Sequence, residues 1–103
     1  MIAYLQKSTK SDKKYMVKIV DTDDSTKTVH FGTNGYSDYL KHKDFDRMQR
    51  YTDRHKKNEN WTKSGIKTAG FWSKWLLWNK PTMSESIRYI EKKFNIKIIR
   101  KRR

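Results

Sequence analysis

Trp61–Pro81, with the sequence WTKSGIKTAGFWSKWLLWNKP, contains all four tryptophans of this 103-residue chain. Phe71, Leu76 and Leu77 lie among them. Large aromatic side chains bury more apolar area per residue than other side chains. Only 34% of the residues are hydrophobic and 35% are charged, so the chain has little other material for a core. We therefore expect this segment to form the core or to hold a partner.

The apolar spacing predicts a helix from about Thr68 to Trp78 that is apolar over more than half of its circumference. A helix of this kind is buried or meets a partner, and Pro81 stops it. We expect the core to take most of its aromatic side chains from here, namely Phe71, Trp75 and Trp78.

Two amphipathic helices are predicted on either side. The first runs from about Asp44 to Lys57, and the second begins at a capping box formed by Thr82 and Glu85 and ends near Asn95. Their expected core faces are Phe45, Met48, Tyr51 and His55 in the first helix and Met83, Ile87, Ile90 and Phe94 in the second.

Alternating apolar residues predict a β-hairpin formed by Tyr15–Val20 and Lys27–Phe31. Ile96–Ile99 is short and β-branched, which favours a last strand. Met1–Gln6 is compatible with a short strand or with an arm, and Lys7–Lys14 is predicted to be a loop.

Together these elements predict an α+β domain in which a small antiparallel sheet, the hairpin plus the C-terminal strand, packs against about three helices around a tryptophan-rich core. The length fits a single domain. We expect this domain at residues 15–99, with an arm or loop at 1–14 and a basic tail at 100–103.

The formal net charge of +14 is extreme for this length. Such a charge attracts polyanions, and nucleic acid is the first candidate, before an anionic membrane surface or an acidic protein. Between Lys41 and Lys74 there are ten Lys or Arg residues against four acids. Basic residues interleaved with aromatic ones favour contact with a phosphate backbone. The alternative is a solvated face that only aids solubility.

The candidate nucleic-acid contacts lie on the first helix, in the loop after it and in the tail. Arg47, Arg50 and Arg54 recur at helical spacing, which can align them with a row of phosphates. The full candidate set is Lys41, Lys43, Arg47, Arg50, Arg54, Lys56, Lys57, Trp61, Lys63, Lys67, Arg100, Lys101, Arg102 and Arg103.

Trp61 differs from the other tryptophans because it lies outside the helical stripe, in a polar run. It is the best candidate for an exposed ring that stacks on an unpaired base. Asn60, Thr62 and Ser64 in the same run can bond phosphates or a neighbouring protein, or can cap helices.

Catalysis finds little support in the sequence. His30, His42 and His55 are scattered, and no histidine spacing typical of a metal site occurs. A small nuclease that uses these histidines with nearby Asp or Asn residues is a minority interpretation. Asp21–Asp24 is too short for a calcium loop and is typical of a turn. We expect no enzyme, no cofactor and no metal.

Several other classes of protein are excluded by features that the sequence lacks. There is no cysteine, which excludes disulfides and thiolate metal sites. No apolar run approaches the length of a membrane span, and Met1–Leu5 is too short for the core of a signal peptide. We therefore expect a protein that is not secreted and has no membrane span.

Several ordered phrases resemble a family of short, basic, uncharacterised proteins encoded by large eukaryotic (nucleocytoplasmic) DNA viruses. The resemblance covers about residues 15–99, and its phrases are His30–Gly32, Gly35–Tyr39, His42–Asp44, Arg54–Lys56, Glu59–Trp61 and, most specific, Gly65–Pro81. It implies a setting and no mechanism: the virion or the virus factory in the host cytoplasm, or the nucleus, with DNA favoured over RNA as a partner.

Two functions remain open from the sequence. The first is a non-enzymatic nucleic-acid-binding protein, associated with a viral genome or virion. The second is a minor structural protein of a viral shell, whose aromatic residues and basic tail bind acidic surfaces of larger subunits.

Overall fold

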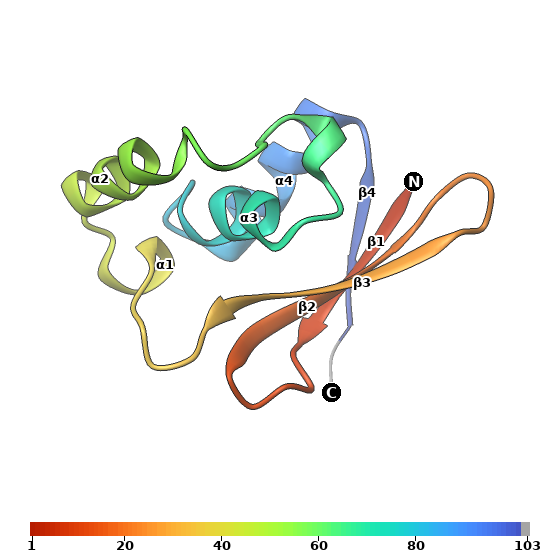
Figure 1. Cartoon of the computed structure of the whole chain (residues 1–103), viewed down its shortest axis with the longest axis horizontal. Helices are drawn as coiled ribbons and strands as arrows, with labels where there is room; N and C mark the ends of the chain where they lie inside the picture. The colour runs from red at the N-terminus through yellow and green to blue at the C-terminus, as the bar shows by residue number, and fades with distance from the viewer. Residues whose placement is uncertain (102–103) are drawn as a thin grey trace.

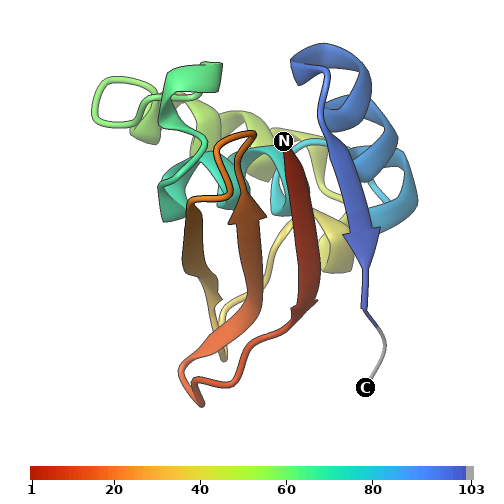
Figure 2. The ribbon, with the colours of Figure 1, turned by 90° about the vertical axis from the view of Figure 1, so that its right-hand side faces the viewer.

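The computed structural model describes residues 1–101, and it is built on a four-stranded sheet (Figures 1 and 2). The strand order is β3-β2-β1-β4. The strands are β1 (Ile2–Lys7), β2 (Lys13–Val20), β3 (Thr26–Thr33) and β4 (Lys97–Arg100). The helices lie on one face of this sheet, as Figure 2 shows, and leave the other face open.

The helical elements follow one another between β3 and β4. They are α1 (Tyr39–His42), α2 (Phe45–His55), the 3₁₀ turn η1 (Lys63–Gly65), α3 (Ala69–Trp72), the π-helical turn η2 (Ser73–Leu77) and α4 (Met83–Phe94). None of the helices within residues 1–101 is long and apolar enough to cross a bilayer. The α+β fold with a tryptophan-containing aromatic cluster, predicted from the sequence, is confirmed.

The first strand corrects the predicted domain boundary. Ile2–Lys7 pairs antiparallel with β2 on one side and parallel with β4 on the other. Residues 1–14 are therefore not an arm outside the domain, because they supply an inner strand and the turn after it. The parallel pairing, in which Ile2 lies opposite Lys97, makes the sheet mixed, while the hairpin of β2 and β3 is antiparallel as predicted.

The core lies between the sheet and the helices. Period-two alternation places Ala3, Val17, Ile19 and Phe31 on the covered face, each with an exposed fraction of 1% or less. Trp72 is completely buried against them, and its ring centroid lies 6.4 Å from that of Phe31. Its Nε1 donates a hydrogen bond of 2.6 Å to the carbonyl oxygen of Ile66, which satisfies the one polar atom of the side chain.

The other aromatic residues of the tryptophan segment surround Trp72 unequally. Phe71 is fully buried, as predicted. Trp75 and Trp78 pack against the core but remain partly exposed. The prediction that they are core residues therefore holds only in part. The central tryptophan of the core is Trp72.

The helix predicted from Thr68 to Trp78 is divided into two types of turn. Thr68 caps α3, because its side chain accepts a hydrogen bond from the Phe71 amide. After one α-helical turn the chain continues as η2 with π-helical geometry. Leu76, Leu77 and the side chain of Lys74 are all buried in this wider turn. Leu76 and Leu77 are adjacent in the sequence, and in an α-helix adjacent side chains point about 100° apart. The turn η2 buries both of them.

Helix α2 begins where the sequence predicted, with Asp44 accepting hydrogen bonds from the amides of Asp46 and Arg47. It has no fully buried residue, and Phe45 is 59% exposed. The predicted core stripe is thus wrong at Phe45, which lies in the first turn, beyond the reach of the core. Met48, Tyr51 and His55 are partly buried.

Helix α4 and its caps follow the prediction closely. The Thr82 hydroxyl accepts a hydrogen bond of 3.2 Å from the Glu85 amide, and Asn95 ends the helix with a φ of 54°. Ile87, Ile90 and Phe94 are buried, as expected from their spacing.

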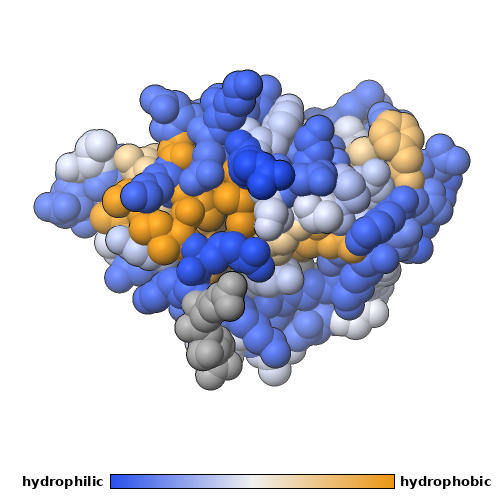
Figure 3. All heavy atoms as spheres, turned by 180° about the vertical axis from the view of Figure 1, so that it is seen from behind, coloured by the Kyte–Doolittle hydropathy of each residue, from blue (hydrophilic) through white to orange (hydrophobic). Residues whose placement is uncertain are grey.

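The uncovered face of the sheet carries a small apolar patch. The register places Ile2 opposite Val20 and Tyr4 opposite Ile99, and these side chains are partly buried. Figure 3 views the molecule from behind and shows an apolar area surrounded by hydrophilic residues. We call Ile2, Tyr4, Val20 and Ile99 the open-face patch.

Replacing Trp72 with Ala should cost ~3–5 kcal/mol of unfolding free energy, because it removes a fully buried ring and orphans the Ile66 carbonyl. Urea denaturation followed by circular dichroism measures this loss. Trp75→Ala is the matched control, and its loss should be smaller because that ring is partly exposed. Equal losses would contradict the central position assigned to Trp72.

Gly65→Ala should destabilise the protein, because an added Cβ would collide with the backbone carbonyl of Asn60. That backbone cannot yield as a flexible side chain would. The measurement is a thermal melt compared with that of Lys63→Ala, which changes an exposed residue in the same turn. An unchanged melting temperature for Gly65→Ala would show that residues 60 and 65 are not in contact.

Candidate functional site

A groove of about 680 Å³ lies where the β2–β3 hairpin meets α2 and the tryptophan segment. We call it the basic groove. Its hairpin side includes Lys13, Lys14 and the end of β3, and one face of α2 forms the other side. The α2 residues that line it are Arg47, Tyr51, Arg54 and His55. Their positions recur at helical spacing, which brings them to one face.

Cations outnumber carboxylates in the basic groove. Lys13, Lys14, Arg47 and Arg54 line it, against Asp38 and Glu59. The Nζ of Lys14 lies 2.6 Å from the carboxylate of Asp38, and both side chains are at most 10% exposed. Because Asp38 also caps α1, this pair is structural. Lys13, Arg47 and Arg54 are the cations left to meet an anionic ligand.

Aromatic rings form part of the groove wall. Tyr51 stacks on Trp78 with ring centroids 4.4 Å apart and an interplanar angle of 2°. His55 also packs against Tyr51, with ring centroids 4.3 Å apart. At the rim, Tyr36 is 70% exposed. A groove with cations and flat apolar surfaces can contact both phosphates and bases.

Lys74 holds α2 against the tryptophan segment. Its Nζ donates hydrogen bonds to the Thr52 hydroxyl at 2.9 Å and to the Trp78 carbonyl at 3.2 Å. Within residues 1–101 no carboxylate forms a salt bridge with it. Burial lowers the pKa of this ammonium. The charge is compensated instead by the rings of Trp61 and Trp75, whose centroids lie 5.5 and 5.7 Å away.

His42 lies behind the groove wall, with its ring 5.3 Å from that of Trp78. Its Nδ1 accepts a hydrogen bond of 2.9 Å from the Asp44 amide, which requires a lone pair on that nitrogen. Desolvation, followed by the charge of Arg47, lowers the pKa of His42. The neutral imidazole is therefore favoured here, and the ring helps to shape the turn between α1 and α2.

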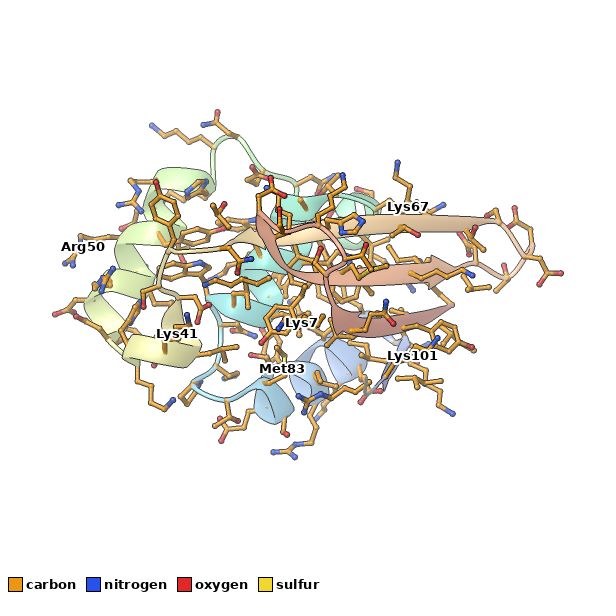
Figure 4. All side chains as sticks on the ribbon, turned by 90° about the horizontal axis from the view of Figure 1, so that it is seen from below. Lys7, Lys41, Arg50, Lys67, Met83 and Lys101 are labelled. Atoms are coloured by element: carbon orange, nitrogen blue, oxygen red, sulfur yellow. The ribbon has the colours of Figure 1, made fainter. Side chains whose placement is uncertain are left out.

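The structure brings only part of the predicted contact set into the basic groove. Arg47 and Arg54 line it, whereas Arg50 points outward from α2, as Figure 4 shows. The remaining predicted cations of this region are exposed around α1 and α2 without lining the groove: Lys41, Lys43, Lys56 and Lys57. Lys43 donates to the Leu40 carbonyl, and Lys56 lies 3.8 Å from Asp53.

Other predicted contacts lie far from this end of the molecule. Figure 4 shows Lys41 and Arg50 near α2, with Lys67 and Lys101 beside the sheet. Lys67 pairs with Asp21 at 3.5 Å. Arg100 ends β4, and the Nζ of Lys101 lies 5.8 Å from the ring centroid of Tyr4. Arg102 and Arg103 lie outside the described residues. The predicted set is thus not one continuous surface.

Trp61 and Lys63 belong to a second hollow, of about 610 Å³, which we call the tryptophan cleft. Its lining is Trp61, Thr62, Lys63, Trp75, Lys93, Phe94 and Asn95. Trp61 is partly buried, and its carbonyl accepts a hydrogen bond of 3.0 Å from Nε1 of Trp75. The ring predicted to be exposed is only partly exposed, and it forms a wall of this cleft.

Sequence reasoning missed Lys13, Lys14 and Tyr36 as groove residues. The sequence predicts a loop for the two lysines. They are brought to α2 because β2 begins at residue 13 and pairs with the end of β3. Tyr36 offered one signal, because it is an aromatic residue in a polar, glycine-containing turn. Such a residue in a loop often contacts a partner.

The three histidines do not gather in one place. His30 lies on β3 with its Nδ1 2.7 Å from the Ser8 hydroxyl, whereas His42 and His55 lie in α1 and α2. Within residues 1–101 no group of three or more His, Asp or Glu side chains is arranged to hold a metal ion. A nuclease built from these histidines therefore gains no support from their positions.

Comparison with known proteins identifies a family that matches part of the chain. Residues 3–55 match the profile of a family of unknown function, DUF5754. No curated protein and no solved structure matches the sequence significantly. The matched region contains β1 to β3, α1 and α2, and therefore both long sides of the basic groove, but not the tryptophan segment.

The alkaline stability of the protein should depend on Tyr51. Burial, followed by the charge of Glu59, raises its pKa from 10.0 to about 12. The folded state thus binds the phenolic proton more tightly, so stability is fully present below pH 10 and is lost as the pH rises from 10 to 12. Two pKa units correspond to up to ~3 kcal/mol.

Tyr51→Phe removes this titration while retaining the ring stacked on Trp78. Urea denaturation at pH 9 and pH 12 should show a smaller alkaline loss for the variant than for the wild type. Other titrating groups, Lys74 among them, contribute equally to both proteins and cancel. Identical losses would mean that Tyr51 is not desolvated.

Proposed function

The chain belongs to this family of unknown function, and on the basis of its own surface we propose that it is a non-enzymatic nucleic-acid-binding protein whose contact site is the basic groove. Arg47, Arg54 and Lys13 would contact phosphates, and Tyr36 would lie against a base or sugar at the rim. The observation that carries the proposal is the collection of these cations on one side of a hollow whose wall includes stacked aromatic rings.

The net charge supports a polyanionic partner. A formal charge of +14 on 103 residues produces a field that draws in anionic polymers and repels cationic ones. Since phosphate contacts release condensed counterions, affinity should fall steeply with salt, by ~0.9 in log K per phosphate contact for each tenfold rise in salt on duplex DNA. Contacts of this kind carry little sequence information.

The groove residues fit this role better than the rest of the cationic surface. Arg47 and Arg54 extend from one helix that is fixed to the core through Lys74 and Thr52. Lys13 extends from a strand of the sheet. Because both elements are anchored, ligand contacts here require less ordering of the protein than contacts from a free tail would.

The proposed partner is DNA rather than RNA, and the proposed setting is a viral genome or virion. Both statements rest on the resemblance to small basic proteins of large DNA viruses, which implies a virus factory in the host cytoplasm, the virion or the nucleus as the place of action.

One observation favours the second candidate, a minor structural protein of a viral shell. The open-face patch is apolar, and no helix among residues 1–101 covers it. Lys18 and Lys97 project from the same face in register with Tyr4 and Ile2. A larger subunit with an acidic rim around an apolar site would complement this face. Such a protein would bind shell subunits in the absence of nucleic acid.

Arg47→Ala with Arg54→Ala should weaken nucleic-acid binding about tenfold and reduce the salt slope by ~2, because two phosphate contacts are lost. Fluorescence anisotropy with labelled single-stranded DNA, duplex DNA and RNA at several salt concentrations measures both quantities. The wild type should bind most tightly at low salt and show a slope of several.

The matched control is Arg50→Ala with Lys57→Ala, which removes the same charge from α2 and the turn after it without touching the groove. We expect this variant to retain the salt slope of the wild type. If both variants lose affinity equally, the groove is not the contact site. If the wild type binds none of the three ligands at low salt, the proposal is wrong.

A further inference from the structure

The tryptophan cleft is separate from the basic groove and combines aromatic walls with cations at its edge. Trp61, Trp75 and Phe94 line it together with Lys63 and Lys93. It lies between the turn η1 and the C-terminal end of α4, whereas the basic groove lies between the hairpin and α2. Figure 1 shows these two places on different sides of α3.

The rings of the cleft are not equally available to a ligand. Trp75 stacks on Tyr89 with ring centroids 5.6 Å apart and meets Phe71 and Phe94 edge-on. Among the aromatic ring pairs within residues 1–101, none includes Trp61. Among the aromatic residues that line the cleft, Trp61 is therefore the one whose ring is not paired with another aromatic ring.

The charge at the cleft decides between two classes of ligand. Aromatic walls suit either a cation or a flat neutral ring. Lys63 and Lys93 line the cleft, and the Nζ of Lys93 lies 5.7 Å from the Trp75 ring centroid. The buried ammonium of Lys74 also lies against Trp61. A cationic ligand would be repelled, whereas a flat ring attached to an anionic group would be attracted.

An unpaired hydrogen-bond donor lies at the same wall. Nε1 of Trp61 is buried and has no acceptor among the described residues. A buried donor without an acceptor raises the free energy of the folded protein. Because this N–H lies in the plane of the indole and is buried, a ring that stacks on the face of Trp61 does not reach it, and the donor stays unpaired on stacking.

We propose that the tryptophan cleft binds one unpaired nucleobase, stacked on Trp61, with the phosphate of the same nucleotide held by Lys63 and Lys93. Base–aromatic stacking of this kind depends on the flat face that all bases share, so it distinguishes unpaired from paired bases rather than one sequence from another. The inference rests on the proposed nucleic-acid binding and assigns the preferred form, a single strand.

The two sites would therefore contact different parts of a nucleic acid. The basic groove contacts phosphates, which single strands and duplexes both present. The cleft accepts only a base that has left a duplex, because paired bases are stacked on their neighbours and cannot enter. The protein should therefore bind a single strand more tightly than a duplex.

The test compares four labelled ligands by anisotropy: a thymidine 12-mer, a duplex of the same length, an abasic 12-mer with the same phosphates, and free thymidine monophosphate. The variants are Trp61→Ala and the conservative Trp61→Phe. We expect Trp61→Ala to weaken binding of the thymidine 12-mer on the order of tenfold, to leave the duplex and the abasic strand within about twofold, and Trp61→Phe to retain most of the affinity.

A second pair of variants tests the phosphate contact without altering the aromatic wall. Lys93→Ala changes a residue that lines the cleft, and Lys92→Ala removes the same charge from the adjacent exposed position of α4. Lys93→Ala should weaken binding of the thymidine 12-mer several-fold more than Lys92→Ala. This comparison also decides the question if Trp61→Ala fails to fold, since both lysines are exposed.

The outcomes separate the two proposals. If the wild type binds the thymidine 12-mer and the abasic strand equally, and Lys93→Ala equals Lys92→Ala, the cleft is not a base site although the basic groove can still bind phosphates. Saturable binding of the free monophosphate alone would identify the cleft as a mononucleotide site and overturn the single-strand assignment. If no nucleic acid binds, both proposals fall.

Discussion

The structure depends on the burial of a few large aromatic side chains against the sheet, because the chain contains few other apolar residues. Trp72 and Phe71 are completely buried, and Phe31 contacts Trp72 from β3. Since burial of apolar surface provides the main favourable free energy of folding, this contact has to offset the self-repulsion of a formal net charge of +14. The tryptophan segment meets this demand by wrapping a π-helical turn onto the sheet, so that Leu76 and Leu77 are buried together.

The constraint extends to a charged residue, because Lys74 is buried within the tryptophan segment. Its ammonium is held by a hydroxyl, a carbonyl and two tryptophan rings rather than by a carboxylate. The same side chain connects three places: it ties α2 to η2 through Thr52, it contacts the wall of the tryptophan cleft through Trp61, and its bond to the Trp78 carbonyl lies beside the ring that Tyr51 covers. Lys74 therefore contacts elements that line both hollows.

The two hollows have different chemistry although both are cationic. The basic groove presents arginines from α2 opposite the hairpin, with a structural ion pair between Lys14 and Asp38 that fixes its shape. The tryptophan cleft presents an aromatic ring with two lysines at its edge. Exposed arginine and lysine side chains are suited to phosphate oxygens, and an indole that is not paired with another aromatic ring is suited to the face of a base. A polymer that carries both groups along its length can engage both hollows.

The sequence by itself determined the α+β class, the hairpin, the capped helix α4 and the basic character of the surface, because each follows from local periodicity, local caps or composition. It did not determine that Ile2–Lys7 is an inner strand, that Trp72 is the central ring, or that Lys13 and Tyr36 face α2. Nor did it separate Arg47 and Arg54 from Arg50 as groove residues. Those facts depend on which segments meet across the fold. Whether a short apolar strand lies inside a sheet or at its edge depends on the strands that pair with it. A cation lines a groove only when another element forms the opposite wall.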